Sequence, residues 1–186
     1  MRLIDDILRA AAHVADEAEI FCARTESIAA ELKQDRIAIG SKLKGSGIII
    51  RIIKDGKIGV SCTDNPGTWK TCLDAACASA RFADPVPWKG LPFPEMIDQK
   101  PLAFDSRISP DPVLVTDLIR RLKAGSETYD AYITSGSASV AISERTLANS
   151  NGLCYSTKGT QVHISLEMIA GQSTGYESDT SWNLDS

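Results

Sequence analysis

The sequence predicts an α+β fold in which antiparallel or mixed sheets carry amphipathic helices packed on them. Two kinds of periodicity indicate this class. In three segments, apolar residues recur every three or four positions, as on one face of a helix. Between and after these segments, apolar and polar residues alternate, which is typical of half-buried strands. An Asp-Gly pair inside an isoleucine-rich run adds a hairpin signal.

The chain begins with a predicted amphipathic helix. The segment "LIDDILRAAAHVADEA" repeats apolar residues with a helical period, and we expect His13 on the polar or flanking side of this helix. Residues 18–39 then change to alternation and predict two strands, with a turn between them at Thr25–Ser27. One side of the second strand carries Ile28, Ala30 and Leu32.

The segment "GSGIIIRIIKDGKIGVSCTDNP" predicts a β-hairpin. Its first strand is apolar on both faces at Ile48–Ile50, so we expect it to be central in its sheet. Asp55-Gly56 is the pair that a two-residue hairpin loop favours. The second strand is expected to be half-buried, with an inward face formed by Ile58, Val60 and Cys62.

Two further helices are predicted to begin at an Asx-Pro pair, with Asn65-Pro66 and Asp111-Pro112 supplying the N-cap and the first helical position. The apolar stripe of the first of these helices contains Trp69, Cys72, Leu73, Ala76, Cys77 and Ala80. That of the second contains Val115, Leu118, Ile119 and Leu122, with Gly125 near the end of the helix. We interpret both stripes as surfaces that pack on the core.

Residues 84–112 form a Pro-rich connection between the two halves. Seven of the eight prolines lie here, and proline favours extended backbone without an amide donor. We expect this segment to lie over the surface, anchored by Trp88, Phe93 and Phe104; the alternative is a disordered linker.

A second group of strands follows the last helix. One strand alternates at Ala138, Val140 and Ile142, and a turn is expected at Asn149–Gly152. The inward face of the next strand is expected to hold Val162, Ile164, Leu166 and Met168. The outward face is expected to hold Gln161, His163, Ser165 and Glu167.

These elements predict three parts: an N-terminal α+β domain at residues 1–83 (helix, four strands, helix), the connection at 84–112, and a helix-plus-strands segment at 113–186. Because the last residues are polar and still strand-like, we expect the final segment to continue into a C-terminal domain.

The composition weighs against some classes of protein. The formal net charge of −4 and the scattered basic residues argue against a nucleic-acid-binding domain. No apolar run reaches the roughly 18 residues of a membrane span, and the acidic start is unlike a signal peptide. We therefore expect a cytoplasmic protein. The five irregularly spaced cysteines are interpreted as reduced core or near-core residues: Cys22, Cys62, Cys72, Cys77 and Cys154.

No residue is predicted to be catalytic, cofactor-binding or metal-binding. His163 and Glu167 share a strand face but lack a third ligand at an evident spacing. Ser135, Ser137 and Ser139 alternate along a strand with no base marked as a partner. The short "KGSG" segment precedes a strand, whereas a phosphate site needs a helix N-terminus.

The order of the motifs resembles the N-terminal half of the TldD/PmbA family, once called modulators of DNA gyrase. The motifs that carry the resemblance are the strand-"DGKIG"-strand hairpin, "FDSRI" before the third helix, and "NSNG" before the last strands. Together, in this order, they cover nearly the whole chain. "NSNGLCYSTKGT" followed by "GYESDTSW" is more similar to the PmbA/TldE type than to the TldD type.

The resemblance implies a subunit of a two-subunit metallopeptidase that acts on peptides or unfolded proteins, in peptide maturation or antitoxin turnover. The TldD type carries a zinc motif, H-E-x-x-x-H, which is absent from these 186 residues. Zinc is therefore expected in a C-terminal half or in a partner, which is a homologous TldD-like subunit or a second copy. The alternative is a non-catalytic module that binds a partner protein such as gyrase.

Overall fold

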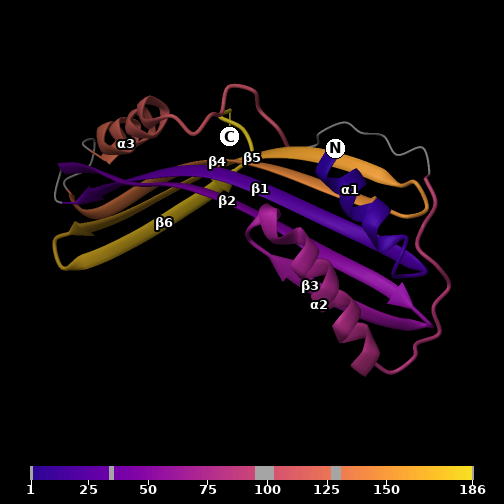
Figure 1. Ribbon diagram of the computed structural model, residues 1–186. Coiled ribbons are helices and arrows are strands. Elements are labelled where there is room, and N and C mark those ends of the chain that lie inside the picture. Colours follow the sequence, from indigo (N-terminus) through magenta and orange to yellow (C-terminus); the bar gives the residue numbers. More distant parts are fainter. Residues whose placement is uncertain (1, 34–35, 95–102, 127–130, 186) are drawn as a thin grey trace. The chain divides into compact units, whose positions relative to one another are not determined.

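The computed structural model describes residues 2–33, 36–94, 103–126 and 131–185 (Figure 1). The described elements confirm the α+β class. The helices are α1 (Arg2–Ala11), a short 3-10 turn (Pro66–Thr68), α2 (Trp69–Phe82) and α3 (Pro112–Ser126). The strands are β1 (Glu17–Lys33), β2 (Arg36–Lys54), β3 (Lys57–Thr63), β4 (Tyr132–Asn149), β5 (Cys154–Ala170) and β6 (Ser173–Ser181). They form one sheet in the order β3-β2-β1-β4-β5-β6.

The chain divides into two compact units that are discontinuous in sequence. Unit 1 comprises Met1–Arg24, Gly45–Lys100 and Glu144–Thr157. Unit 2 comprises Thr25–Lys44, Pro101–Ser143 and Lys158–Ser186. The predicted parts 1–83, 84–112 and 113–186 follow the order of elements along the chain, whereas each unit collects segments from before and after the connection. None of the helices in the described part of the chain is long and apolar enough to cross a membrane.

The core of unit 1 lies between the sheet and the helices α1 and α2. Ile7 of α1 and Ala76 of α2 are fully buried against the apolar faces of β1 and β2. Ile20, Ile50 and Ile52 supply these faces and are fully buried themselves. The predicted stripes of both helices are therefore confirmed as core-facing. His13, predicted to belong to the first helix, lies in the exposed turn after α1, which ends at Ala11.

The β2–β3 hairpin has the predicted two-residue loop. Lys54 pairs with Lys57 across the turn, and both loop residues adopt positive φ angles, 51° at Asp55 and 71° at Gly56. Two positive φ angles are typical of a type I′ turn, whose twist matches that of the flanking strands. The predicted central position of β2 is confirmed, but Ile49 is 42% exposed, so the second face of this strand is not covered there.

The predicted inward face of β3 is wrong. The register places Gly59 opposite the buried Ile52 and Ser61 opposite the buried Ile50, so these small residues face the core. Val60 is 47% exposed, and Cys62 is exposed too. The reason is that α2 lies directly over β3, where only a small residue leaves room for the helix backbone.

The predicted turn at Thr25–Ser27 is also absent, because β1 runs without interruption from Glu17 to Lys33. The polar residues there coincide with the point where β1 passes from unit 1 into unit 2, between Arg24 and Thr25. A polar interruption of the alternation therefore marks a division between cores in this chain.

The core of unit 2 lies between α3 and the sheet. The carboxylate oxygen Oδ1 of Asp111 accepts a hydrogen bond from the Val113 amide at 2.8 Å, as expected of an N-cap. The buried Val115 and Ile119 of α3 pack in a cluster with residues from β1, β4 and β5. These strand residues are Ile28, Ala30, Leu32, Ala138, Val140 and Val162.

Before α3 begins at Pro112, the described parts of the Pro-rich connection contain neither helix nor strand. Trp88 is half-buried as predicted, but Phe93 is 72% exposed and does not anchor the segment. Leu91, at 3% exposure, is buried in its place. Residues 95–102 lie outside the described part of the chain.

Candidate functional site

The "NSNG" segment forms the joint between β4 and β5 in unit 1. Asn149 is 2% exposed, and its Oδ1 accepts hydrogen bonds from the amides of Asn151 and Leu153, both at 3.0 Å. Its Nδ2 donates to the carbonyl oxygen of Pro92 at 2.8 Å. Gly152 has a φ of 88°, a conformation that favours glycine. The segment is therefore a fixed turn that also holds the Pro-rich connection.

Glu17, at the start of β1, collects three hydrogen-bond donors in the same unit. Its Oε2 accepts from Trp88 Nε1 at 2.6 Å, and its Oε1 accepts from the Leu91 amide at 3.0 Å and from Asn151 Nδ2 at 3.1 Å. These bonds favour the ionised form: the Leu91 amide, followed by Trp88 and Asn151, lowers the pKa of Glu17 against the opposing effect of burial. Glu17 thus joins β1, the connection and the β4–β5 turn.

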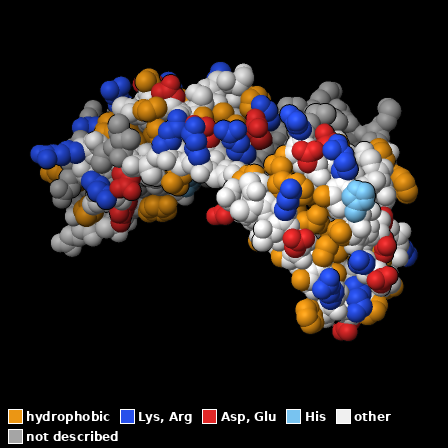
Figure 2. Space-filling model, viewed as in Figure 1, with side chains coloured by type: hydrophobic (Ala, Val, Ile, Leu, Met, Phe, Trp, Pro, Cys, Tyr) orange, Lys and Arg blue, Asp and Glu red, His pale blue; other side chains and the backbone are white. Residues whose placement is uncertain are grey.

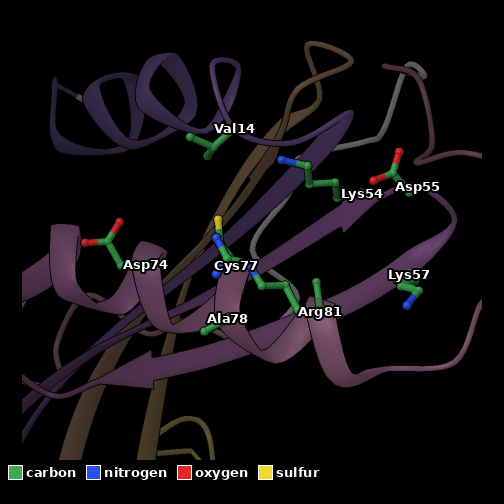
Figure 3. A pocket seen from close by; sticks show the side chains of 9 residues that line it. Val14, Lys54, Asp55, Lys57, Asp74, Cys77, Ala78 and Arg81 are labelled. Atoms are coloured by element: carbon green, nitrogen blue, oxygen red, sulfur yellow. The ribbon is translucent and has the colours of Figure 1, made fainter.

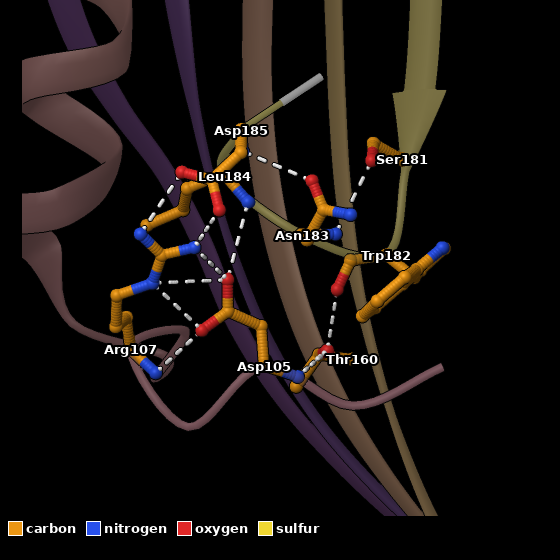
Figure 4. Close-up of polar contacts among 8 residues, drawn as sticks. All are labelled: Asp105, Arg107, Thr160, Ser181, Trp182, Asn183, Leu184 and Asp185. Carbon is orange, nitrogen blue, oxygen red and sulfur yellow. Dashed lines mark hydrogen bonds and ion pairs between the residues drawn. The ribbon is translucent and has the colours of Figure 1, made fainter. Parts of the chain in front are cut away.

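The "FDSRI" motif forms a second polar cluster, in unit 2 (Figure 4). The Asp105 carboxylate accepts hydrogen bonds from the Arg107 amide at 2.9 Å and from Arg107 Nη2 at 2.7 Å. Arg107 also donates through Nη1 to Asp185 at 3.0 Å. Asp105 donates its own amide to Thr160 Oγ1 at 2.9 Å, and Thr160 donates that hydroxyl to the Trp182 carbonyl at 2.7 Å.

The charges of this cluster stabilise one another. Hydrogen bonds from the Arg107 side chain and amide hold the pKa of Asp105 well below its usual range. Arg107 likewise lowers the pKa of Asp185, and the two carboxylates raise the pKa of Arg107. The guanidinium therefore connects the segment before α3 to the segment after β6, and its donors are used in structural contacts.

His163 and the serine residues considered in the sequence analysis lie on strands β4 and β5 of unit 2. His163 Nδ1 lies 2.9 Å from Thr180 Oγ1, whereas Glu167 accepts a hydrogen bond from Ser135 at 3.0 Å. Ser137 bonds to Ser165, Oγ to Oγ, at 2.7 Å. The structure does not bring His163 and Glu167 together, and among the described residues no group of three or more His, Cys, Asp or Glu side chains could hold a metal ion.

The cysteines are only partly in the core. All five are free thiols. Cys72 is buried, and Cys22 and Cys77 are half-buried, but Cys62 and Cys154 are exposed, contrary to the prediction. Burial raises the pKa of the Cys22 thiol.

A groove of about 720 Å³ opens in unit 1 between the turn after α1, the β2–β3 hairpin and α2 (Figure 3). This volume is within the range of about 300–1,000 Å³ typical of ligand pockets. Its lining residues are Val14, Lys54, Asp55, Lys57, Asp74, Cys77, Ala78, Ala80 and Arg81. Sequence patterns do not predict this groove, because its walls come from three separate segments.

Comparison with known proteins agrees with the fold and with these motifs. The model of the first domain of the PmbA/TldA metallopeptidases matches residues 18–80, and the model of their central domain matches residues 105–186. The two matches together define the class: the first and central domains of this group of proteins. The chain belongs to the PmbA/TldD family. No curated protein matches it by sequence.

Solved structures show the same fold. TldE from Thermococcus kodakarensis is 26% identical, with a TM-score of 0.83 over 98% of this chain and 44% of that chain. A proposed modulator of a DNA gyrase from Thermotoga maritima is 14% identical, with a TM-score of 0.74 over 96% of this chain and 42% of that chain. A proposed gyrase modulator from Bacteroides thetaiotaomicron is 18% identical, with a TM-score of 0.72 over 96% and 43%. The chain thus spans less than half the length of these relatives.

Proposed function

We propose that this chain is the N-terminal part of a subunit of a cytoplasmic metallopeptidase assembly that acts on peptides or unfolded proteins. The observation that carries the proposal is the match to both PmbA/TldA metallopeptidase domains. We further propose that the subunit is of the non-zinc, TldE-like type. Its 26% identity to TldE supports this assignment, together with the similarity of "NSNGLCYSTKGT" and "GYESDTSW" to the PmbA/TldE type.

The role proposed for these residues is structural. Glu17, Asp105 and Arg107 use their polar atoms to join segments, and His163 and Glu167 are bonded to different neighbours. The described residues therefore do not fit a zinc site, which needs at least three convergent ligands. We infer that zinc and the attacking water belong to a partner subunit or to a C-terminal half.

The test is to isolate the tagged full-length protein from its own cells, identify the co-purifying proteins by mass spectrometry and measure zinc. We expect a stoichiometric, zinc-carrying relative and peptidase activity that a chelator removes. A zinc-bearing homo-oligomer would place the metal site in a C-terminal half of this subunit. Isolation of the protein with neither zinc nor a relative contradicts the peptidase proposal.

The second candidate is a non-catalytic module that binds another protein. It is favoured by the descriptions of the Thermotoga and Bacteroides relatives as proposed modulators of DNA gyrase. Co-purification of gyrase subunits at stoichiometric amounts, without a zinc-carrying relative, would support this candidate over the first.

A further inference from the structure

We propose that the groove of unit 1 binds a short acidic segment of a peptide, with Lys54 and Arg81 holding a carboxylate and the apolar lining holding an adjacent side chain. This inference deepens the proposed function and rests on it for the choice of a peptide as the ligand. The groove is distinct from the polar clusters around Glu17 and Arg107, which contribute none of its lining residues.

The walls of the groove are fixed by local hydrogen bonds. The Asp16 amide donates to the Ile53 carbonyl at 2.9 Å, and Asp16 Oδ2 accepts from the Asp55 amide at 2.8 Å. These two bonds tie the turn after α1 to the hairpin loop. On the other side, α2 is held against β3 by the close approach at Gly59. The groove is therefore formed before any ligand arrives, which reduces the entropy cost of binding.

The cations of the groove are available for a ligand. Lys54 and Arg81 are exposed, Lys57 is half-buried, and no carboxylate of the described residues lies within ion-pair distance of any of the three. By contrast, Lys33, Lys42, Lys44 and Arg51 each have a carboxylate partner. The groove is lined by three cationic and two acidic side chains. The local excess of positive charge contrasts with the net charge of −4 of the whole chain.

The arrangement of these charges favours an anion in the middle of the groove. Figure 3 shows Lys54 and Cys77 pointing into the space below Val14, with the Arg81 guanidinium reaching towards Cys77. Asp74 and Asp55 lie at opposite ends of the groove. Burial raises the pKa of the Cys77 thiol, and among the nearby charges Lys54 and Arg81 lower it while Asp74 raises it, which agrees with their proximity to the sulfur.

The rest of the lining suits an aliphatic side chain. Val14, which is 38% exposed, lines the groove from the turn after α1, and Ala78, an exposed apolar residue, lines it from α2. Figure 2 shows hydrophobic side chains interleaved with basic and acidic ones over α1 and α2. A free inorganic anion would use only the cations, whereas a peptide that combines Asp or Glu with Leu or Val would use both surfaces.

The experiment measures binding of a fluorescein-labelled peptide of alternating Glu and Leu residues to the full-length protein by anisotropy. A peptide with Gln in place of Glu is the matched probe. We expect the acidic peptide to bind, the Gln peptide to bind at least about tenfold more weakly, and the affinity to fall with added salt. The double variant Lys54→Gln/Arg81→Gln should weaken binding of the acidic peptide by about tenfold or more.

The control variant is Arg9→Gln/Lys33→Gln, which removes two exposed cations with other partners and gives the same change in net charge. It should bind as the wild type does. A second readout uses Cys77 in a Cys62→Ser/Cys154→Ser background, where bound peptide should slow modification of Cys77 by a neutral maleimide, measured by mass spectrometry. This readout locates the peptide in the groove.

Unchanged affinity in the Lys54→Gln/Arg81→Gln variant, or equal affinity for the Gln peptide, would overturn the proposal. Displacement of the peptide by inorganic phosphate at equal concentration would also overturn it, because it would identify a simple anion site. The outcome is independent of the isolation experiment above. A protein that is isolated with neither zinc nor a relative, yet binds the acidic peptide at this groove, would contradict the peptidase assignment and retain the binding site.

Discussion

Gly59 of β3 lies directly against Ala76 of α2. A Cβ atom built on Gly59 would lie 2.0 Å from the carbonyl oxygen of Ala76 and 2.7 Å from the amide nitrogen of Ala80. Both are backbone atoms, so a rotamer change cannot relieve the overlap. The absence of a side chain at residue 59 therefore sets the distance between α2 and the sheet in unit 1.

Replacing Gly59 by Ala should destabilise the protein, because α2 must move away from β3 and lose contacts with the core. We expect a loss of about 1–3 kcal/mol in the free energy of unfolding, as for other overpacked sites. Chemical denaturation of the full-length protein measures it. The control is Gly45→Ala, since a Cβ on Gly45 meets no atom within 4 Å and its φ is not positive. Equal stability of the two variants would contradict the close packing.

The hairpin and its neighbours show which features local sequence can predict. Asp55-Gly56 predicted the turn correctly because the positive φ angles of a type I′ loop restrict the residues that fit. The inward face of β3 was predicted wrongly because alternation was assigned from hydrophobicity alone. The face that packs on α2 carries Gly59 and Ser61, and this choice reflects the helix above it, which a strand pattern does not report.

Glu17→Gln should weaken the joint between β1, the connection and the β4–β5 turn. A glutamine keeps one acceptor oxygen but places an NH₂ group where the carboxylate accepts from Trp88 or from Leu91 and Asn151. One donor then faces another donor, and we expect a loss on the order of 1 kcal/mol in the free energy of unfolding.

The control for this prediction is Glu31→Gln, which removes an exposed carboxylate paired with Lys33 and should have almost no effect on stability. Tryptophan fluorescence gives a second readout, since the indole of Trp88 donates to Glu17 at 2.6 Å. If Glu17→Gln leaves both the stability and the emission spectrum unchanged, the hydrogen bonds to Glu17 do not contribute to the joint.

Asn149→Ala should loosen the Pro-rich connection as well as the β4–β5 turn. It removes two hydrogen bonds within the turn and the bond to Pro92, all three of them partly buried. We expect a loss of roughly 2–3 kcal/mol in the free energy of unfolding. Limited proteolysis should also cleave the segment around Pro92 faster than in the wild type. Gln161→Ala, at an exposed position of β5, is the control, and equal cleavage rates in the two variants would argue against the role of Asn149.

The polar contacts that the "NSNG" and "FDSRI" motifs make could not be predicted from the periodicity of apolar residues. "NSNG" and "FDSRI" were identified by resemblance to a family, while their contacts depend on partners far along the chain. Asn149 and Pro92 are 57 residues apart, and Arg107 and Asp185 are 78 residues apart. The resemblance correctly predicted the family, and the physical reason for each motif became evident only from the fold.

Arg107 should make the stability of the protein depend on pH in the acid range. The pKa of Asp105 in the folded protein is held below its ordinary value of 3.8, mainly by hydrogen bonds from Arg107. Near and below pH 3.8, the unfolded chain therefore binds more protons than the folded chain. The stability from this contact is present at higher pH and is lost as the pH falls towards the pKa of Asp105 in the folded protein. Asp185 contributes with the same sign, since Arg107 lowers its pKa too.

Arg107→Gln should lower the melting temperature at neutral pH and flatten its decline between about pH 5 and pH 2, because Asp105 and Asp185 then titrate nearer their unfolded values. Thermal unfolding followed by circular dichroism over this range measures both effects. Arg121→Gln is the matched control: it removes an exposed arginine of α3 that pairs with Asp117, and should leave the pH profile of the wild type intact. A wild-type profile in Arg107→Gln would mean that the cluster does not couple proton binding to folding, and the joint would then depend on the Asp105–Thr160 hydrogen bond instead.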